Sequence, residues 1–215
     1  MWDLARRRRL DRVRDAYTVR FRAHGETHQG VLWKSAAAQT LRFERLLDIL
    51  SDHPMGRPMT INDLGCGWGA LFEHIARAPH LPPLAAYRGY DICPDMVMAA
   101  RKRIRDPRAR FTVASGVQAD ADYGIASGTF NLSMGVAPDA WDIHVRQDLR
   151  DLWRRSRRGL AFNLLDLGRL DGADPGTLHY VDPDAYLAFC RRYMSADVTV
   201  AVDDPIPDVT FLVRR

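Results

Sequence analysis

Apolar positions in the first quarter of the chain recur at helical spacing. Within residues 3–23 the apolar side chains include Leu10 and Val13, and their spacing predicts a helix. A second helix is predicted from Ser35, whose hydroxyl suits an N-cap, to about Leu50. The following stretch SDHPMGRP interrupts the pattern, because proline and glycine end helices.

From residue 59 onward, short apolar runs alternate with segments of helical periodicity. Seven strands are predicted, over residues 59–65, 85–92, 109–115, 122–130, 158–166, 197–202 and 208–215. Helices are predicted between them, over residues 69–77, 95–105, 143–155 and 183–193. Strands separated by helices pair in parallel, whereas the short turn DDPIP makes the last strand antiparallel. The predicted fold is therefore α/β, with a doubly wound, mostly parallel seven-stranded sheet.

The loop after the first predicted strand, DLGCGWGA, fits two kinds of cofactor. As Gly65-x-Gly67-x-x-Ala70 it matches a dinucleotide fingerprint, in which glycines let the backbone approach a pyrophosphate. As Asp63-x-Gly65-x-Gly67-x-Gly69 it matches a loop for a nucleoside cofactor without phosphate, such as S-adenosylmethionine. The loop alone leaves hydride transfer and sulfonium chemistry both open.

Two carboxylates favour the second interpretation. Asp63 lies beside the start of the helix that would face a pyrophosphate, where another negative charge is unfavourable. Asp91 ends the second predicted strand, 22 residues beyond Gly69, at the spacing of a ribose-binding acid. A cofactor with a cationic amine, a sulfonium and ribose hydroxyls suits both carboxylates.

Three segments, INDLGCGWGALFEHIA, YRGYDICPDMVMAARKR and ARFTVASG, resemble the class I S-adenosylmethionine-dependent methyltransferases in order and spacing. The resemblance implies a Rossmann-like fold with S-adenosylmethionine as the cofactor. It implies that Asp91 binds the ribose diol and that Ile92 and Met96 pack on the adenine. For Met96 a role in the core alone is an equal alternative. The implied cofactor contacts in these segments and after the fourth strand are Asp63, Gly65, Cys66, Gly67, Asp91, Ile92, Met96 and Ser127.

The segment after the third predicted strand departs from this family. Family members have an acidic residue there that contacts the adenine amine, and a helix before the fourth strand. Here the chain reads FTVASGVQADADYG, which places Ser115 and Gly116 at the turn and leaves too few residues for a helix. We therefore expect the backbone of Gly116 and Val117 to hold the adenine, with Asp120 as a further candidate.

Residues 1–58 are predicted to form a helical lid over a cofactor-binding core of residues 59–215. In the lid segment a His24-Gly25 pair, Trp33 and a Gln39-x-x-Arg42-Phe43 run precede the first predicted strand. In these features it resembles one branch of small methyltransferases, in which such a segment closes over the cofactor. The resemblance implies that Arg42, which shares a helix face with Gln39, binds the cofactor carboxylate in bidentate fashion. It also implies that Trp33 lies against the sulfonium as a cation–π partner. The alternatives are an exposed Arg42 paired with Glu44 or Glu26, and a core position of Trp33.

Methyl transfer from a sulfonium is an in-line displacement, and alignment of the reactants supplies roughly 7–11 kcal/mol of its barrier. A general base is then optional, so the reaction needs no recognisable nucleophile–histidine motif. His144 is expected to be structural. The residues expected to shape the acceptor pocket are Asn131, Asn163, Tyr180, His24 and Tyr17.

Three other functions stay open from the sequence. The short lid allows closure over the cofactor alone, so that its amine attacks its own γ-carbon and forms a four-membered ring. Azetidine-2-carboxylate synthases, which are similar to small members of this fold, carry out that reaction. A non-catalytic cofactor-binding module and an NAD-dependent reductase are the remaining alternatives. Methyl transfer to a small molecule is favoured over all three.

Composition limits the expected partners. The formal net charge is +4 and the cations are mostly arginines, but they lie on separate predicted helices rather than along one groove. We therefore expect no nucleic-acid partner. The three cysteines have no metal-ligand spacing, so neither a metal nor a disulfide is expected. Without an apolar run of 18 residues, a cytoplasmic protein without membrane contact is expected, as a monomer or homodimer.

Overall fold

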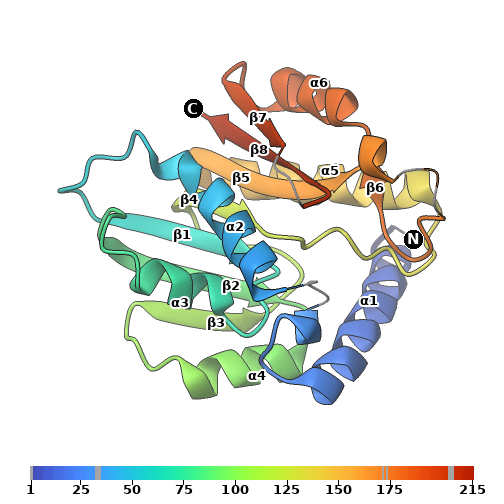
Figure 1. The fold of residues 1–215 in the computed structure, drawn as a ribbon, viewed down its shortest axis with the longest axis horizontal. Helices are drawn as coiled ribbons and strands as arrows, with labels where there is room; N and C mark the ends of the chain where they lie inside the picture. The colour runs from blue at the N-terminus through green and yellow to red at the C-terminus, as the bar shows by residue number, and fades with distance from the viewer. Residues whose placement is uncertain (1, 32–34, 171, 173, 203–205) are drawn as a thin grey trace.

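The computed structural model describes residues 2–31, 35–170, 172, 174–202 and 206–215. Its centre is one open sheet with the strand order β3-β2-β1-β4-β5-β8-β7, flanked by helices on both faces (Figure 1). β1 to β5 pair in parallel, and β8 pairs antiparallel with β5 and with β7. The prediction of a doubly wound, mostly parallel sheet with an antiparallel last strand is confirmed. The strands are β1 (Met59–Leu64), β2 (Leu84–Asp91), β3 (Ala109–Val113), β4 (Ala121–Ala126), β5 (Ser156–Asp166), β6 (Tyr180–Val181), β7 (Val198–Val202) and β8 (Asp208–Arg214).

The helices divide into two layers and one crossing helix. The buried residues of α2, α3 and α4 share one hydrophobic cluster with one face of the sheet. Those of α5 and α6 share a second cluster with the other face. Neighbouring strand residues alternate between the two, as Phe211 and Leu212 of β8 show. The helices are α1 (Trp2–His24), α2 (Ala36–Leu47), α3 (Ala70–Ala76), α4 (Pro94–Arg103), α5 (Pro138–Arg154) and α6 (Pro183–Tyr193), with short 3-10 turns η1 (Gln29–Val31), η2 (Asp48–Leu50) and η3 (Leu167–Arg169).

Two predicted boundaries are wrong on the carboxyl side of the sheet, and one short strand there was not predicted. α5 begins at Pro138 rather than at residue 143, because proline at the first helical position is well tolerated. β4 ends at Ala126, and its apolar continuation to Phe130 turns away at Gly128, whose φ is +64°. β6 was not predicted, since two residues leave no periodic signal; it makes an eighth strand beside the end of β5.

α1 runs across the carboxyl ends of the parallel strands (Figure 1). Near its start Arg6 forms an ion pair with Asp148 of α5, at 3.0 Å. Near its end Arg22 forms an ion pair with Asp95 of α4, at 2.7 Å. The helix is therefore held at both ends, to opposite layers of the fold. No helix of the described residues is long and apolar enough to cross a membrane.

Candidate functional site

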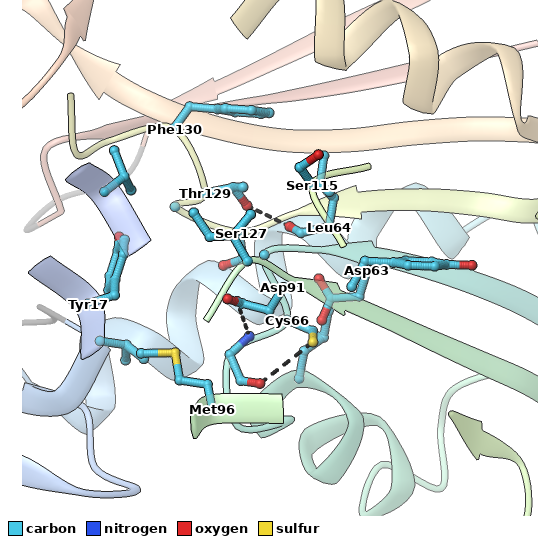
Figure 2. Close-up of a pocket in the computed structure, with 18 of the residues that line it drawn as sticks. Tyr17, Asp63, Leu64, Cys66, Asp91, Met96, Ser115, Ser127, Thr129 and Phe130 are labelled. Atoms are coloured by element: carbon cyan, nitrogen blue, oxygen red, sulfur yellow. Dashed lines mark hydrogen bonds between the residues drawn. The ribbon is translucent and has the colours of Figure 1, made fainter. Parts of the chain in front are cut away.

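A cavity lies between α1 and the carboxyl ends of β1, β2 and β4, where an open α/β sheet usually binds its ligand. The empty space between its walls is about 960 Å³, which includes solvent at its open mouth. Figure 2 shows Tyr17 and Met96 on the side of the helices and Asp63 and Ser127 on the side of the strand ends. Asp91 lies between these two groups.

The glycine loop forms the floor of the cavity beside β1. Gly65 and Gly67 have φ angles of +76° and +54°, a left-handed conformation that favours glycine. The amides of Gly65 and Cys66 both donate to the carbonyl of Tyr90, at 2.7 and 3.1 Å. A Cβ atom at Gly65 would lie 2.5 Å from Oγ1 of Thr129. The loop is thus fixed to β2 and packed closely against the chain that follows β4.

Asp91 at the end of β2 is oriented by two backbone amides. Its Oδ2 accepts from the amide of Gly67 at 2.9 Å, and its Oδ1 accepts from that of Cys93 at 2.7 Å. Burial raises the pKa of Asp91, and the amide donors oppose that shift. Each carboxylate oxygen retains a second lone pair that a ligand hydroxyl can use.

Only one of the two carboxylate oxygens of Asp63, at the end of β1, has a hydrogen-bond partner. Tyr87 donates its hydroxyl proton to Oδ2, whereas Oδ1 is buried and has no hydrogen-bond partner. Burial raises the pKa of Asp63 to about 7, the Tyr87 hydrogen bond opposes this, and the charge of Asp91 adds to it. A cationic group bound beside Oδ1 would complete the hydrogen bonding and stabilise the ionised carboxylate.

α1, α5 and the turn after β4 also contribute to the lining of the cavity. Leu10 and Val13 of α1 line it together with Trp141 and His144 of α5. Asp148 lies one helical turn beyond His144 and also lines the cavity. Hereafter the α1–α5 wall means Leu10, Val13, Phe130, Trp141, His144 and Asp148, and the strand wall means Asp63, Gly65, Cys66, Gly67, Asp91 and Ser127.

Unpartnered polar atoms concentrate around this cavity. Among the described residues nine buried side-chain nitrogen or oxygen atoms lack a hydrogen-bond partner. Four belong to residues that line the cavity: Asp63 Oδ1, Trp68 Nε1, Ser127 Oγ and His144 Nδ1. Buried polar groups are normally hydrogen-bonded, so this concentration indicates a polar ligand. A carboxylate, a hydroxyl and an indole N–H fit a ligand that carries both an amine and a carboxylate.

Most of the residues predicted to bind the cofactor meet at this cavity. Tyr17, expected at the acceptor, lies on its α1 side. Ala114 and Ser115, rather than Gly116 and Val117, line it after β3. The predicted cofactor contacts in the lining are Asp63, Gly65, Cys66, Gly67, Asp91, Ile92, Met96 and Ser127.

Arg42 does not reach the cavity; its guanidinium is in a buried ion pair. Its Nε donates to the carboxylate of Asp208 at 3.0 Å, its NH2 group donates to the same carboxylate, and NH1 donates to the carbonyl of Ala38. Only 4% of Arg42 is exposed. The sequence correctly placed Arg42 on the face of α2 that it shares with Gln39, but only Gln39 lines the cavity. The alternative of an exposed Arg42 paired with Glu44 or Glu26 is right only in that an ion pair forms: the pair is buried, and its carboxylate belongs to Asp208.

Asn163 supports the cavity from beneath. Its Oδ1 accepts from the amide of Gly128 at 2.7 Å, and its Nδ2 donates to Asp208 at 2.9 Å. It is fully buried and does not line the cavity. Asn163 therefore positions the turn after β4, because both ends of its side chain are already bonded.

The other predicted acceptor residues lie away from the lining. Asn131 is buried next to His179, whose amide donates to the Asn131 carbonyl at 2.8 Å. Tyr180 begins β6, and His24 is exposed at the end of α1. Asp120, the further adenine candidate, pairs with Arg155 at 3.3 Å on the surface.

Trp33, the expected cation–π partner of the sulfonium, lies outside the described residues. Trp68, between two glycines of the loop, is 8% exposed and lines the cavity, with the guanidinium of Arg103 5.2 Å from its ring centroid. Trp68 therefore packs over the loop as part of the cavity lining.

Sequence reasoning missed most of the α1–α5 wall, and it expected His144 on a surface helix. His144 is instead 2% exposed, on the inner face of α5. One feature of the sequence could have predicted this wall. Trp141, His144 and Asp148 are three and four residues apart, which places them on one face of the helix.

Comparisons with known proteins agree with this architecture. A family profile described as a methyltransferase domain matches residues 61–161. A candidate methyltransferase of Mycobacterium tuberculosis is 35% identical over 159 residues, 74% of this chain and 94% of that protein.

Two solved structures share the fold at low identity. Magnesium protoporphyrin IX methyltransferase of Synechocystis with bound S-adenosylmethionine has a TM-score of 0.59 at 13% identity, over 83% of this chain and 80% of that one. A Leishmania major S-adenosylmethionine-dependent methyltransferase has a TM-score of 0.65 at 12% identity, over 94% and 82%.

Proposed function

Because the chain belongs to the class I S-adenosylmethionine-dependent methyltransferases, we propose that it methylates a small molecule bound in the cavity beneath α1. Bound S-adenosylmethionine supplies an electrophilic methyl group on a sulfonium. The observation that carries the small-molecule proposal is the position of α1, which runs across the strand ends and lines the cavity. An acceptor must fit between this helix and the cofactor.

The strand wall offers complementary groups for the ribose and for the amine of the cofactor. In the proposed placement Asp91 accepts hydrogen bonds from the ribose hydroxyls. Asp63, with its unpartnered Oδ1, takes the amine, and the unpartnered Ser127 hydroxyl lies near the same end. Ile92 and Met96 contact the adenine, with Ser115 at its edge. The loop glycines keep the backbone close to the methionine part.

Within the predicted lid segment of residues 1–58, α1 acts as the lid in this proposal, whereas α2 packs on the sheet with α3 and α4; the core from residue 59 holds the cofactor. Tyr17 lines the cavity from α1, and burial, together with the negative charge of Asp91, raises the pKa of its hydroxyl. That hydroxyl therefore stays protonated and acts as a hydrogen-bond donor or as an apolar wall rather than as a base.

Cyclisation of the cofactor is the second candidate function. Ring closure requires a neutral amine, and Asp63 is the group placed to receive it. Burial raises the pKa of Asp63 to about 7, so that part of the carboxyl population is neutral at pH 7 and a neutral amine is tolerated. A non-catalytic cofactor-binding module remains the third candidate.

Incubation with S-adenosylmethionine, followed by mass spectrometry, separates these candidates. We expect S-adenosylhomocysteine to form only when the small-molecule filtrate of a cell extract is added, and not with its nucleic-acid fraction. Methylthioadenosine with a cyclised amino acid, formed without any acceptor, would establish cyclisation instead. Binding without any product would support a non-catalytic module. The Asp91→Ala variant is the control, because it removes the expected ribose contact.

A further inference from the structure

The α1–α5 wall is not used by the proposed cofactor placement. It is mostly apolar: Leu10 and Val13 come from α1, Phe130 follows β4, and Trp141 belongs to α5. The Trp141 indole donates to the carbonyl of Phe130 at 2.9 Å, which fixes the indole ring against the turn that carries Phe130. A flat apolar molecule fits walls of this kind.

His144 is the neutral polar side chain among these apolar groups. Its ring centroid lies 4.8 Å from that of Trp141 and 6.4 Å from that of Phe130. Burial, together with the positive charges of Arg6 and Arg9, lowers the pKa of His144 to about 4. The imidazole is therefore neutral at pH 7, with one ring nitrogen able to accept a proton.

Asp148 is placed to orient this imidazole. Its Oδ1 lies 3.6 Å from Nδ1 of His144, slightly longer than a hydrogen bond. Arg6 donates to both carboxylate oxygens of Asp148, at 3.0 and 3.2 Å, and also to the Ser115 hydroxyl and carbonyl. Such contacts commonly shorten when a substrate binds. With Nδ1–H directed at Asp148, Nε2 becomes the accepting nitrogen.

We propose that the α1–α5 wall binds an aromatic hydroxyl compound, and that His144, positioned by Asp148, accepts the proton of this hydroxyl during methyl transfer. The inference rests on the proposed function. The aromatic walls select the flat ring, and the neutral imidazole selects an O–H donor over an aromatic compound that lacks one.

The step balances without a further reactant. The acceptor hydroxyl gives its proton to Nε2 of His144 while its oxygen forms a bond to the methyl carbon. The carbon–sulfur bond breaks, and its electron pair stays on sulfur, so the sulfonium charge disappears. The positive charge ends on the His144 imidazolium, which Asp148 stabilises through Nδ1–H. Because the hydroxyl becomes more acidic as its oxygen bonds to carbon, a weakly basic imidazole is sufficient.

A binding experiment tests the subsite apart from turnover. Calorimetry on protein saturated with S-adenosylhomocysteine compares 2-naphthol with naphthalene, which has the same rings without the hydroxyl. The wild-type protein is expected to prefer 2-naphthol by about tenfold, the effect of one added hydrogen bond. His144→Phe keeps an aromatic ring without nitrogen and is expected to lose this preference, with S-adenosylmethionine affinity unchanged within about twofold.

Several outcomes would overturn the proposal. They are equal affinity of the wild-type protein for both probes, no binding of 2-naphthol, and an unchanged preference in His144→Phe. Loss of S-adenosylmethionine binding in His144→Phe would place the histidine in the cofactor site and would also overturn it. If thermal unfolding shows that His144→Phe does not fold, His144→Leu, which also has no hydrogen-bond acceptor, is measured by the same criteria. A wild-type protein that binds no S-adenosylmethionine would instead overturn the proposed function.

The rate of 2-naphthol methylation tests the role of His144 as the proton acceptor and the role of Asp148 as the residue that positions it. His144→Phe is expected to lower kcat by about a hundredfold with little change in KM.

Burial raises the pKa of Asp148 to about 6, Arg6 lowers it, and Asp151 raises it. The wild-type kcat is therefore expected to fall as pH drops through 6, because the carboxylate is needed ionised. Asp148→Asn is expected to remove this pH dependence; the same acid limb in the variant would overturn its positioning role.

Discussion

The two walls of the cavity are held in place by different kinds of contact. In the strand wall backbone groups make most of the bonds: the amides of Gly67 and Cys93 hold Asp91, and the Tyr90 carbonyl holds the glycine loop, whereas the Tyr87 side chain bonds Asp63. In the α1–α5 wall side chains make them, since Arg6 of α1 bonds Asp148 of α5. The first wall is formed by local chain geometry, and the second exists only when two distant helices meet.

This difference has a consequence for function. A wall formed by backbone geometry changes little when side chains are substituted. Such a wall suits the cofactor, because every catalytic cycle uses the same cofactor. A wall made by side chains of two helices changes with single substitutions, which suits the selection of an acceptor. The following predictions separate the two walls, beginning with the support beneath the strand wall.

Arg42→Met is expected to have the largest effect, on stability. It leaves the carboxylate of Asp208 buried without its charged partner, which costs about 3–5 kcal/mol in the free energy of unfolding. Denaturation with urea measures this loss. Arg45→Met on the same helix, which removes a partly exposed ion pair with Asp48, is the control and is expected to cost less than about 1 kcal/mol.

The Arg42→Met variant also tests whether Arg42 contributes to cofactor binding. Cofactor affinity of the folded Arg42→Met protein is expected to be close to that of the wild type, because Arg42 does not line the cavity. A large loss of affinity with little loss of stability would contradict the structure and restore the cofactor-carboxylate role that the sequence suggested.

The strand wall was predictable from the sequence because its determinants are contiguous. Asp63 and the glycines lie in one loop, and Asp91 follows at a spacing fixed by one helix and one strand. The partner of Arg42 was not predictable, since Asp208 is 166 residues away and only the antiparallel pairing of β8 with β5 brings it near.

The α1–α5 wall was missed for the same reason. The helical pattern of α5 predicts that His144 and Asp148 share a face, but not that this face meets α1. With no helix between β3 and β4, Arg6 of α1 bonds Ser115 at the end of β3 as well as Asp148. The sequence correctly predicted that no helix lies between β3 and β4. Only the structure shows that Arg6 of α1 bonds to this segment.

Gly65→Val tests the backbone dependence of the strand wall. A β-branched residue is strained at a φ of +76°, and its Cβ would lie 2.5 Å from Thr129 Oγ1, so the loop must shift. Cofactor affinity, measured by calorimetry, is expected to fall by at least about a hundredfold. Gly176→Val is the matched control, because it has a φ of +59° and open space around it. Equal losses in both variants would show that backbone strain alone, and not the close packing of the loop, is responsible.

Asp63 predicts a pH dependence of cofactor binding. Its folded-state pKa, about 7, lies above the ordinary 3.8, so between these values the cofactor-free protein binds the extra proton and loses stability as pH rises. If the cofactor amine binds the ionised carboxylate, affinity is expected to be about tenfold weaker at pH 6 than at pH 8. Asp63→Asn is expected to abolish this dependence in calorimetry. A wild-type affinity that does not change with pH would exclude Asp63 as the amine partner.

Arg6→Ala is expected to have the smallest effect, and it addresses the α1–α5 wall alone. The side chain is 29% exposed, so solvent screens part of its interaction with Asp148, and a loss of about 1 kcal/mol in unfolding free energy is expected. Removing it also leaves Asp148 facing His144 without a cation, which raises the pKa of both groups. Acceptor binding should therefore weaken more than cofactor binding, whereas Arg8→Ala, on the exposed side of the same helix, should change neither. If Arg6→Ala weakened cofactor and acceptor binding equally, α1 would act as one rigid cover, and the division of the cavity into two independent walls would be wrong.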